Sequence, residues 1–183
     1  PDTKFELDNI RPDFLFLRIV ARSIVLWDEV ESTPDWIDKQ MPVFIQNNYA
    51  ILKSKLEKET QNEYGRINID TKAMKEAHIY ITAGACFSLG LIFAGTGNAA
   101  IRDSIIQKVV QIQRLRDDSD PISMLLRPQR PVVEMCLGAA AIALSLVMAG
   151  TGDLKSLRLL KILRWKCDDG VNYGNHMSYA TAI

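Results

Sequence analysis

One glycine-rich segment has the residue types and spacing that could bind the phosphates of a nucleotide. Residues 95–100 read Gly-Thr-Gly-Asn-Ala-Ala, follow an apolar run and open an amphipathic stretch. This order fits the G-x-G-x-x-A pattern, in which a glycine turn and the start of a helix hold the pyrophosphate of a dinucleotide. Asp117 and Asp118 follow about 20 residues later, where an acid would bind the ribose. A dinucleotide-binding enzyme that uses Gly95 and Gly97 is therefore one alternative.

Two features favour a different role for these glycines. The apolar run before them is much longer than the roughly 5–6 residues of a typical β-strand, and it is rich in Ala, Gly and Ser rather than in β-branched residues. The motif also recurs at residues 150–155, where Lys155 takes the place of Ala100 and would crowd the close approach of a helix to a sheet. Both features favour a helix that ends at a turn.

The candidate nucleophiles and metal ligands do not form a recognisable set. Ser88 and Ser145 lie inside apolar runs without the G-x-S-x-G pattern of a nucleophile turn. His78 and His176 have no matched acid partner, and Cys167 lacks the paired cysteine or histidine spacing of a zinc site. We therefore predict that the chain is not an enzyme and has no catalytic residues, metal or cofactor.

The glycine motif belongs to a longer segment that occurs twice. Residues 83–98 (AGACFSLGLIFAGTGN) and 138–153 (GAAAIALSLVMAGTGD) are identical at 7 positions, and the second begins 55 residues after the first. Such self-similarity is typical of repeat proteins, in which one unit cannot bury its own apolar face and must stack on the next. We therefore predict an all-α fold of helical-hairpin repeats stacked into a solenoid or closed toroid.

Each copy predicts a helix, a sharp turn and a second, amphipathic helix. A glycine can adopt the positive φ that ends a helix, and an Asn or Asp directly after it can cap the next one. The predicted turn residues are Gly95, Thr96, Gly97, Asn98, Gly150, Thr151, Gly152 and Asp153. The predicted apolar stripes of the second helices are Ile101, Ile105, Val109 and Ile112, and then Leu154, Leu157, Leu160 and Leu163. Four small residues are predicted to let adjacent first helices pack closely: Ala85, Ala94, Ala140 and Ala149.

The repeat divides the chain into four parts. Residues 1–70 are interpreted as a helical lead-in, a diverged preceding repeat that ends in a solvated loop over 53–70. Residues 71–131 form the first clear repeat, with a long helix to about Ala94 and a charged, proline-containing insertion at the end. Residues 132–170 form the second repeat, and residues 171–183 begin a truncated third, so we expect a fragment of a longer chain.

Composition argues against some classes of partner, and two uncharged segments raise the alternative of a membrane protein. Lys plus Arg equals Asp plus Glu at 22 each, so no bulk charge indicates binding to nucleic acid or to an anionic membrane. Residues 79–101 and 135–152 contain no charged side chain and are long enough to cross a bilayer. However, Gly-Thr-Gly-Asn would break the first span, and a large protein core also contains helices that are apolar all round. We therefore predict no membrane and no nucleic-acid partner.

The pairing of a small-residue helix with Ala-Gly-Thr-Gly-Asn/Asp resembles the proteasome/cyclosome repeat family. Residues 77–90 (AHIYITAGACFSLG), 24–29 (IVLWDE) and 171–177 (VNYGNHM) are similar to segments of its cyclosome branch, found in the largest subunit of the anaphase-promoting complex. The resemblance runs over residues 12–183, nearly the whole chain.

This resemblance implies a non-catalytic scaffold in a cell-cycle ubiquitin ligase, built as a toroid of paired helices in the nucleus and cytoplasm. The partners it implies are the cullin/RING module, the Doc-domain subunit, helical-repeat subunits and β-propeller co-activators. The Gly-Thr-Gly motif alone also fits the proteasome branch. The second alternative is therefore a repeat scaffold of a proteasome regulatory-particle subunit that binds ubiquitin-like domains.

Overall fold

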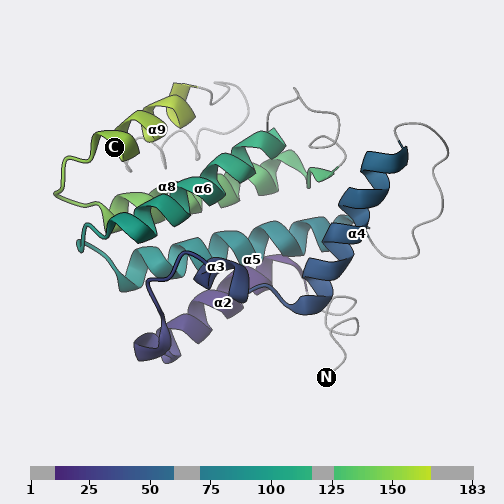
Figure 1. Cartoon of the computed structure of the whole chain (residues 1–183), viewed down its shortest axis with the longest axis horizontal. Helices are drawn as coiled ribbons and strands as arrows, with labels where there is room; N and C mark the ends of the chain where they lie inside the picture. Colours follow the sequence, from purple (N-terminus) through teal and green to yellow (C-terminus); the bar gives the residue numbers. More distant parts are fainter. Residues whose placement is uncertain (1–10, 60–70, 117–125, 166–183) are drawn as a thin grey trace.

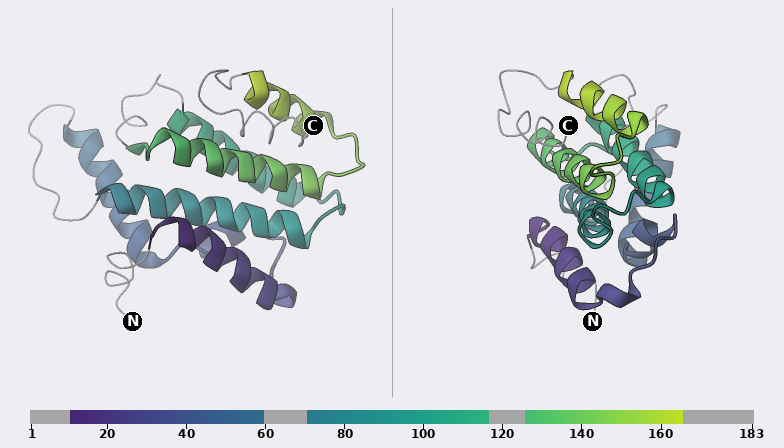
Figure 2. Two further views of the ribbon diagram at one scale, coloured as in Figure 1. Left: turned by 180° about the vertical axis from the view of Figure 1, so that it is seen from behind. Right: turned by 90° about the vertical axis from the view of Figure 1, so that its left-hand side faces the viewer.

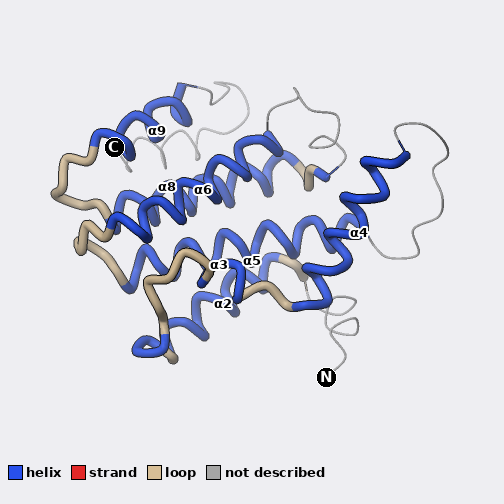
Figure 3. The backbone as a smooth tube through the Cα atoms, in the orientation of Figure 1, coloured by secondary structure: helices blue, strands red, loops and turns tan. Residues whose placement is uncertain are grey.

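The computed structural model describes residues 11–59, 71–116 and 126–165, and every regular element in these ranges is helical (Figures 1 and 3). The predicted all-α class is therefore confirmed. In chain order the elements are α2 (Asp13–Val25), the 3-10 turn η1 (Trp27–Glu29), α3 (Trp36–Lys39), α4 (Val43–Glu59), α5 (Thr71–Ile92), α6 (Ala99–Arg116), α8 (Arg130–Val147) and α9 (Leu154–Trp165).

The helices form two layers. One layer contains α2, α5 and α8 side by side, with α5 packed against both of the others. The second contains α3 and α4, then α6, then α9, as the end-on view in Figure 2 shows. The outer helix α6 packs mainly against α8, the inner helix of the following unit, rather than against its own partner α5. Successive helical hairpins are therefore interleaved.

Two glycines of α5 allow the inner helices to touch. A Cβ added at Gly90 would lie 2.6 Å from the Cα and 2.7 Å from the Cβ of Ala143 in α8. A Cβ added at Gly84 would lie 2.9 Å from the carbonyl oxygen of Phe16 in α2. Real Cβ atoms do not make contacts of this length, so only hydrogen fits at either position. The close approach of α5 to both neighbours therefore depends on Gly84 and Gly90.

The four alanines predicted to mediate close packing lie in two different environments. Ala85 and Ala140 are fully buried in the core between the helices. Ala94 and Ala149 are exposed and lie two residues beyond the ends of α5 and α8. These last two do not lie between the helices, because each helix ends before the glycine turn begins.

The outer helices bury their apolar stripes to different extents. All four stripe residues of α6, Ile101, Ile105, Val109 and Ile112, are buried. In α9, Leu160 and Leu163 are buried, Leu157 is half-buried and Leu154 is 65% exposed. The difference follows from the interleaved packing, because α6 lies against the next inner helix, whereas α9 packs mainly against α8 among the described helices.

The predicted loop over 53–70 is wrong in its first part. Helix α4 continues through Glu59, and residues 60–70 lie outside the described ranges. The segment 53–59 is rich in Lys and Glu, which are good helix formers even where they face water. Leu52 of α4 packs in a small buried cluster with Met74 and Leu126, which fixes this helix against the body of the protein.

Candidate functional site

The first glycine turn closes α5 and starts α6. Gly95 and Gly97 have φ values of +70° and +63°, in the left-handed region that favours glycine. The Thr96 hydroxyl donates a 2.8 Å hydrogen bond to the Phe93 carbonyl. The Asn98 side-chain oxygen accepts from the backbone N–H of Ala100 and of Ile101, at 3.0 and 3.2 Å. Asn98 thus caps α6.

The second turn repeats this geometry between α8 and α9. Gly150 and Gly152 have φ values of +75° and +65°, and the Thr151 hydroxyl donates to the Met148 carbonyl at 2.7 Å. An Asp153 oxygen accepts from the backbone N–H of Ser156 at 2.8 Å and from its hydroxyl at 2.7 Å. These bonds to Ser156, with the nearby Arg102 guanidinium, lower the pKa of Asp153. The two turns are therefore equivalent in conformation as well as in sequence.

The first turn is bonded directly to the end of α8. The Gly95 N–H donates to the Leu146 carbonyl at 2.8 Å, and the Gly97 N–H donates to the Val147 carbonyl at 2.9 Å. Carbonyls in the last turn of a helix have no partner within the helix, so these bonds satisfy two of them. A Cβ added at Gly97 would also lie 3.0 Å from the Thr151 methyl group, so the two turns are in contact.

Charged side chains join the two outer helices beside the turns. An Arg102 guanidinium nitrogen lies 3.1 Å from the Asp153 carboxylate, and the Lys155 ammonium lies 2.7 Å from that of Asp103. Arg102 also pairs with Asp103 at 3.1 Å. The four charges alternate in sign and connect the start of α6 to the start of α9. Sequence reasoning missed this network, because its members are 51 and 52 residues apart.

The turn does not have the geometry of a nucleotide site. The element before Gly95 is the 22-residue helix α5, whereas the dinucleotide motif requires a strand there. The two glycine N–H groups that would face the phosphates are bonded to α8. Asp117 and Asp118 lie outside the described residues. The dinucleotide alternative is therefore wrong, because it requires a strand before the glycines and free glycine N–H groups.

A second candidate feature is a groove of about 620 Å³ lined by residues of α4, α5 and α6. His78 and Tyr49 stack in it with ring centroids 3.9 Å apart and an angle of 7° between the planes. Lys108 also lines it and is bound to Asp38 at 2.6 Å. Burial raises the pKa of Tyr49 to about 12. Burial, with the Lys108 charge, lowers the pKa of His78 to about 4, although Asp38 acts in the opposite direction.

We expect His78 to make stability depend on pH between about 6.5 and 4. Its folded pKa lies below the ordinary value of 6.5, so the unfolded chain binds the proton first as pH falls. Stability is therefore complete above about pH 6.5 and declines toward pH 4, with a loss of about 2–3 kcal/mol from this residue by pH 4.5. Urea unfolding at pH 7 and pH 4.5 measures this loss. In His78→Phe, which keeps a ring beside Tyr49, the loss should be smaller by that amount; an equal loss in both proteins would contradict the prediction.

Comparison with known proteins decides the family. A family model described as the APC1 fifth domain matches residues 1–183, the entire chain. The chain belongs to the APC1 fifth-domain family. It is 36% identical to anaphase-promoting complex subunit 1 of Arabidopsis thaliana over 191 residues and 34% identical to that of Homo sapiens over 183 residues. It is 33% identical over 183 residues to a protein of Emericella nidulans named negative regulator of mitosis.

These relatives are much longer than the chain. Each alignment covers 100% of the chain but only 11%, 9% and 8% of the Arabidopsis, human and Emericella proteins. The chain therefore spans about a tenth of the length of the curated relatives it matches. The match confirms the resemblance to the cyclosome branch.

In this APC1-family chain, the candidate catalytic side chains take part in structural contacts. The Ser88 hydroxyl donates to the Gly84 carbonyl at 2.8 Å, and the Ser145 hydroxyl donates to the Ala141 carbonyl at 2.9 Å. Within residues 11–59, 71–116 and 126–165, no three His, Cys, Asp or Glu side chains gather as possible metal ligands. Cys167 and His176 lie outside these ranges.

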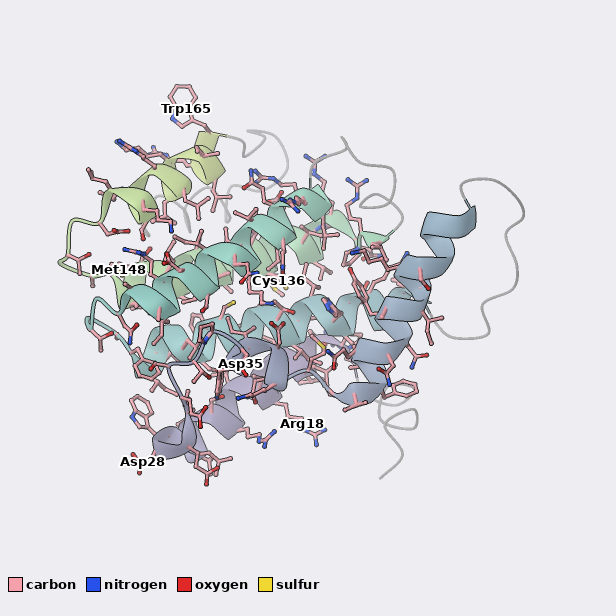
Figure 4. All side chains as sticks on the ribbon, in the orientation of Figure 1. Arg18, Asp28, Asp35, Cys136, Met148 and Trp165 are labelled. Atoms are coloured by element: carbon pink, nitrogen blue, oxygen red, sulfur yellow. The ribbon has the colours of Figure 1, made fainter. Side chains whose placement is uncertain are left out.

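One APC1 fifth-domain helix meets the length and hydropathy of a membrane span. Of the helices that the structure describes, only α8 does so, and 56% of its 18-residue window is buried in the protein. Its buried face lies against α5 and α6, and Cys136 on this helix points into the body of the molecule in Figure 4. Burial raises the pKa of the Cys136 thiol. The core position of α8 accounts for its apolar composition.

Proposed function

We propose that this chain is a non-catalytic scaffold segment of the anaphase-promoting complex, a ubiquitin ligase of the cell cycle. The observation that carries the proposal is the match of the APC1 fifth-domain model to all 183 residues. The names of the relatives, anaphase-promoting complex subunit 1 and negative regulator of mitosis, support the same assignment. The family model and these relatives favour the cyclosome branch over a proteasome regulatory-particle subunit.

The packing supports a role in rigid spacing. The inner helices touch at Gly84 and Gly90, where an interface with no room for a methyl group resists sliding. The turn amides of Gly95 and Gly97 hold one unit to the next by two backbone hydrogen bonds. Helices that are joined at both places keep a fixed distance between the two ends of the stack. Such a segment can hold partner subunits at a set distance without performing chemistry.

The partners proposed for this scaffold are the cullin/RING module, the Doc-domain subunit, helical-repeat subunits and β-propeller co-activators. We also propose that it acts in both nucleus and cytoplasm, closed into a toroid by further repeats. These proposals follow from the resemblance of residues 77–90 and of the two glycine turns to the cyclosome branch.

Gly95→Val in the full-length subunit should reduce assembly of the complex. Valine at φ +70° is strained, and the strain would disturb the two bonds from the turn to α8. Affinity purification from cells, with quantitative mass spectrometry of the co-purified subunits, measures assembly per subunit. We expect several-fold less recovery of the catalytic module with Gly95→Val or Gly150→Val.

Ser88→Ala is the control, because among the described residues this buried hydroxyl bonds to a carbonyl of its own helix. It should leave recovery unchanged. Full assembly by a Gly95→Val subunit whose segment is measurably destabilised would argue against the scaffold role. Recovery of proteasome subunits in place of cyclosome subunits would favour the proteasome alternative.

A further inference from the structure

The groove between α4, α5 and α6 exists because the two outer helices diverge. Among the described helices, α4 packs mainly against α5. It is inclined steeply to α5 in Figures 1 and 2, whereas α6 runs alongside the inner helices. About 620 Å³ therefore stays open between α4 and α6, with α5 as the floor. This volume lies within the roughly 300–1,000 Å³ of ligand-binding clefts in proteins. The groove opens within the outer layer, so it is separate from the ends of the stack, where further repeats would pack.

The rings of Tyr49 and His78 present unused hydrogen-bonding groups to this groove. Both side chains line it and are half-buried. Neither the Tyr49 hydroxyl nor the His78 imidazole is hydrogen-bonded to any residue that the structure describes. Polar groups that are withdrawn from bulk water usually have a partner. A neutral imidazole has one donor and one acceptor nitrogen, and a phenol can donate and accept. The pair therefore fits a ligand that carries both donors and acceptors, as a peptide group does.

Two glutamines on one wall of the groove have a spacing that matches an extended peptide. Gln107 and Gln111 of α6 line the groove, are exposed and share a helix face, because they are one turn apart. One turn is about 6 Å at 1.5 Å per residue. In an extended chain, alternate residues repeat at about 6.6–6.8 Å. Each side-chain amide can donate to and accept from a peptide group. The two glutamines can therefore bond in register to alternate residues of an extended peptide.

The charge of the groove that is not already paired is positive. Its acid, Asp38, is bound to Lys108 at 2.6 Å. Lys53 of α4 and Arg114 of α6 also line the groove, are exposed and form no ion pair with the described residues. Next to Arg114, the half-buried Leu115 adds an apolar surface to the groove. An apolar centre with a polar, charged rim is the arrangement of a protein–protein interface.

We propose that this groove binds an extended, acidic peptide segment of a partner protein. Asp or Glu side chains of the segment pair with Lys53 and Arg114, and its backbone bonds to Gln107 and Gln111. An apolar side chain of the segment packs on Leu115. Complementary charge selects an acidic segment over a basic one, because like charges that face each other across an interface are unfavourable. The assignment depends on this surface alone and holds whichever complex the protein joins.

Site-specific photo-crosslinking in cells tests the proposal. The photo-reactive amino acid p-benzoylphenylalanine replaces Gln46, which is exposed and lines the groove from α4, in the full-length protein. Mass spectrometry then identifies the peptide joined to it. We expect a segment of another protein in which acidic residues outnumber basic ones. A neutral or basic segment, a crosslink within the same polypeptide, or no crosslink would overturn the proposal.

Charge reversal measures the electrostatic part of the binding. A fluorescein-labelled synthetic peptide of the crosslinked segment gives its affinity for the full-length protein by fluorescence anisotropy. The double variant Lys53→Glu, Arg114→Glu should weaken binding by about 10-fold or more. The matched control is Lys161→Glu, Arg164→Glu, which makes the same change of charge at exposed positions of α9. It should leave the affinity within about twofold of wild type. Equal affinities of the two double variants would overturn the proposal.

Tyr49→Phe separates binding from folding. The variant keeps the ring that stacks on His78 and removes a hydroxyl that has no hydrogen-bond partner among the described residues. The melting temperature should therefore not fall, whereas the affinity for the peptide should fall about fivefold through the loss of one hydrogen bond. An unchanged affinity would show that the peptide does not enter the groove and would overturn the proposal.

Discussion

Gly90→Ala is expected to destabilise the folded chain by about 3 kcal/mol. The direction is diagnostic, because replacing glycine by alanine inside an exposed helix ordinarily stabilises it by about 1 kcal/mol. Here the added methyl group would lie 2.6 and 2.7 Å from the Cα and Cβ of Ala143, so α5 and α8 must separate. Separation also opens voids among the buried side chains on both helices. Urea unfolding followed by circular dichroism measures the change.

The rescue variant for this prediction is Ala143→Gly in the Gly90→Ala background. It removes one of the two close contacts and leaves the backbone contact, so it should restore part of the lost stability. Gly84→Ala should also be destabilising, because its methyl group would lie 2.9 Å from the Phe16 carbonyl oxygen in α2. A Gly90→Ala protein as stable as the wild type would show that the inner helices are not in contact at this point.

Glu134→Ala is expected to cost about 3–5 kcal/mol, the range for breaking a buried ion pair on one side. Glu134 of α8 lies 3.5 Å from Arg116 of α6, and their side chains are only 5% and 3% exposed. Two guanidinium nitrogens of Arg116 are buried without a hydrogen-bond partner among the described residues. Removing the carboxylate would therefore leave a buried cation without its counter-charge. Thermal and urea unfolding of the single variant measure the loss.

Replacing both partners separates the contribution of the ion pair to stability from the contribution of side-chain packing. The double variant Arg116→Met, Glu134→Met should be near wild-type stability or above it, because both desolvation costs disappear together. Asp35→Ala is the matched surface control. Asp35 is paired with Lys39 at 2.9 Å, but both side chains face water, so its loss should change stability little. If Glu134→Ala were as mild as Asp35→Ala, the pair would have to be hydrated in solution.

The all-α class and the two helical hairpins could be predicted from the sequence because their signals are local. A small-residue apolar run of more than 15 residues is too long for a strand, and Gly-Thr-Gly followed by Asn98 or Asp153 ends one helix and starts another. The structure contains each of these elements, with α5 ending at Ile92 and α6 starting at Ala99. The end of α4 was mispredicted because charged composition indicates exposure to water, which a solvated helix also has.

The helices, the glycine turns and the family of this chain could be predicted without coordinates, since these depend on residues within a few positions of one another or on the whole pattern. Packing between separate helices decided which small residues touch: Gly84 and Gly90 lie between helices, whereas Ala94 is exposed in a turn. It also decided that the Gly95 amide bonds to Leu146 and that Lys108, on the polar side of α6 by its pattern, is buried against Asp38. The physical reason is distance along the chain: Lys108 and Asp38 are 70 residues apart, and such a pair forms only when packing brings separate helices together.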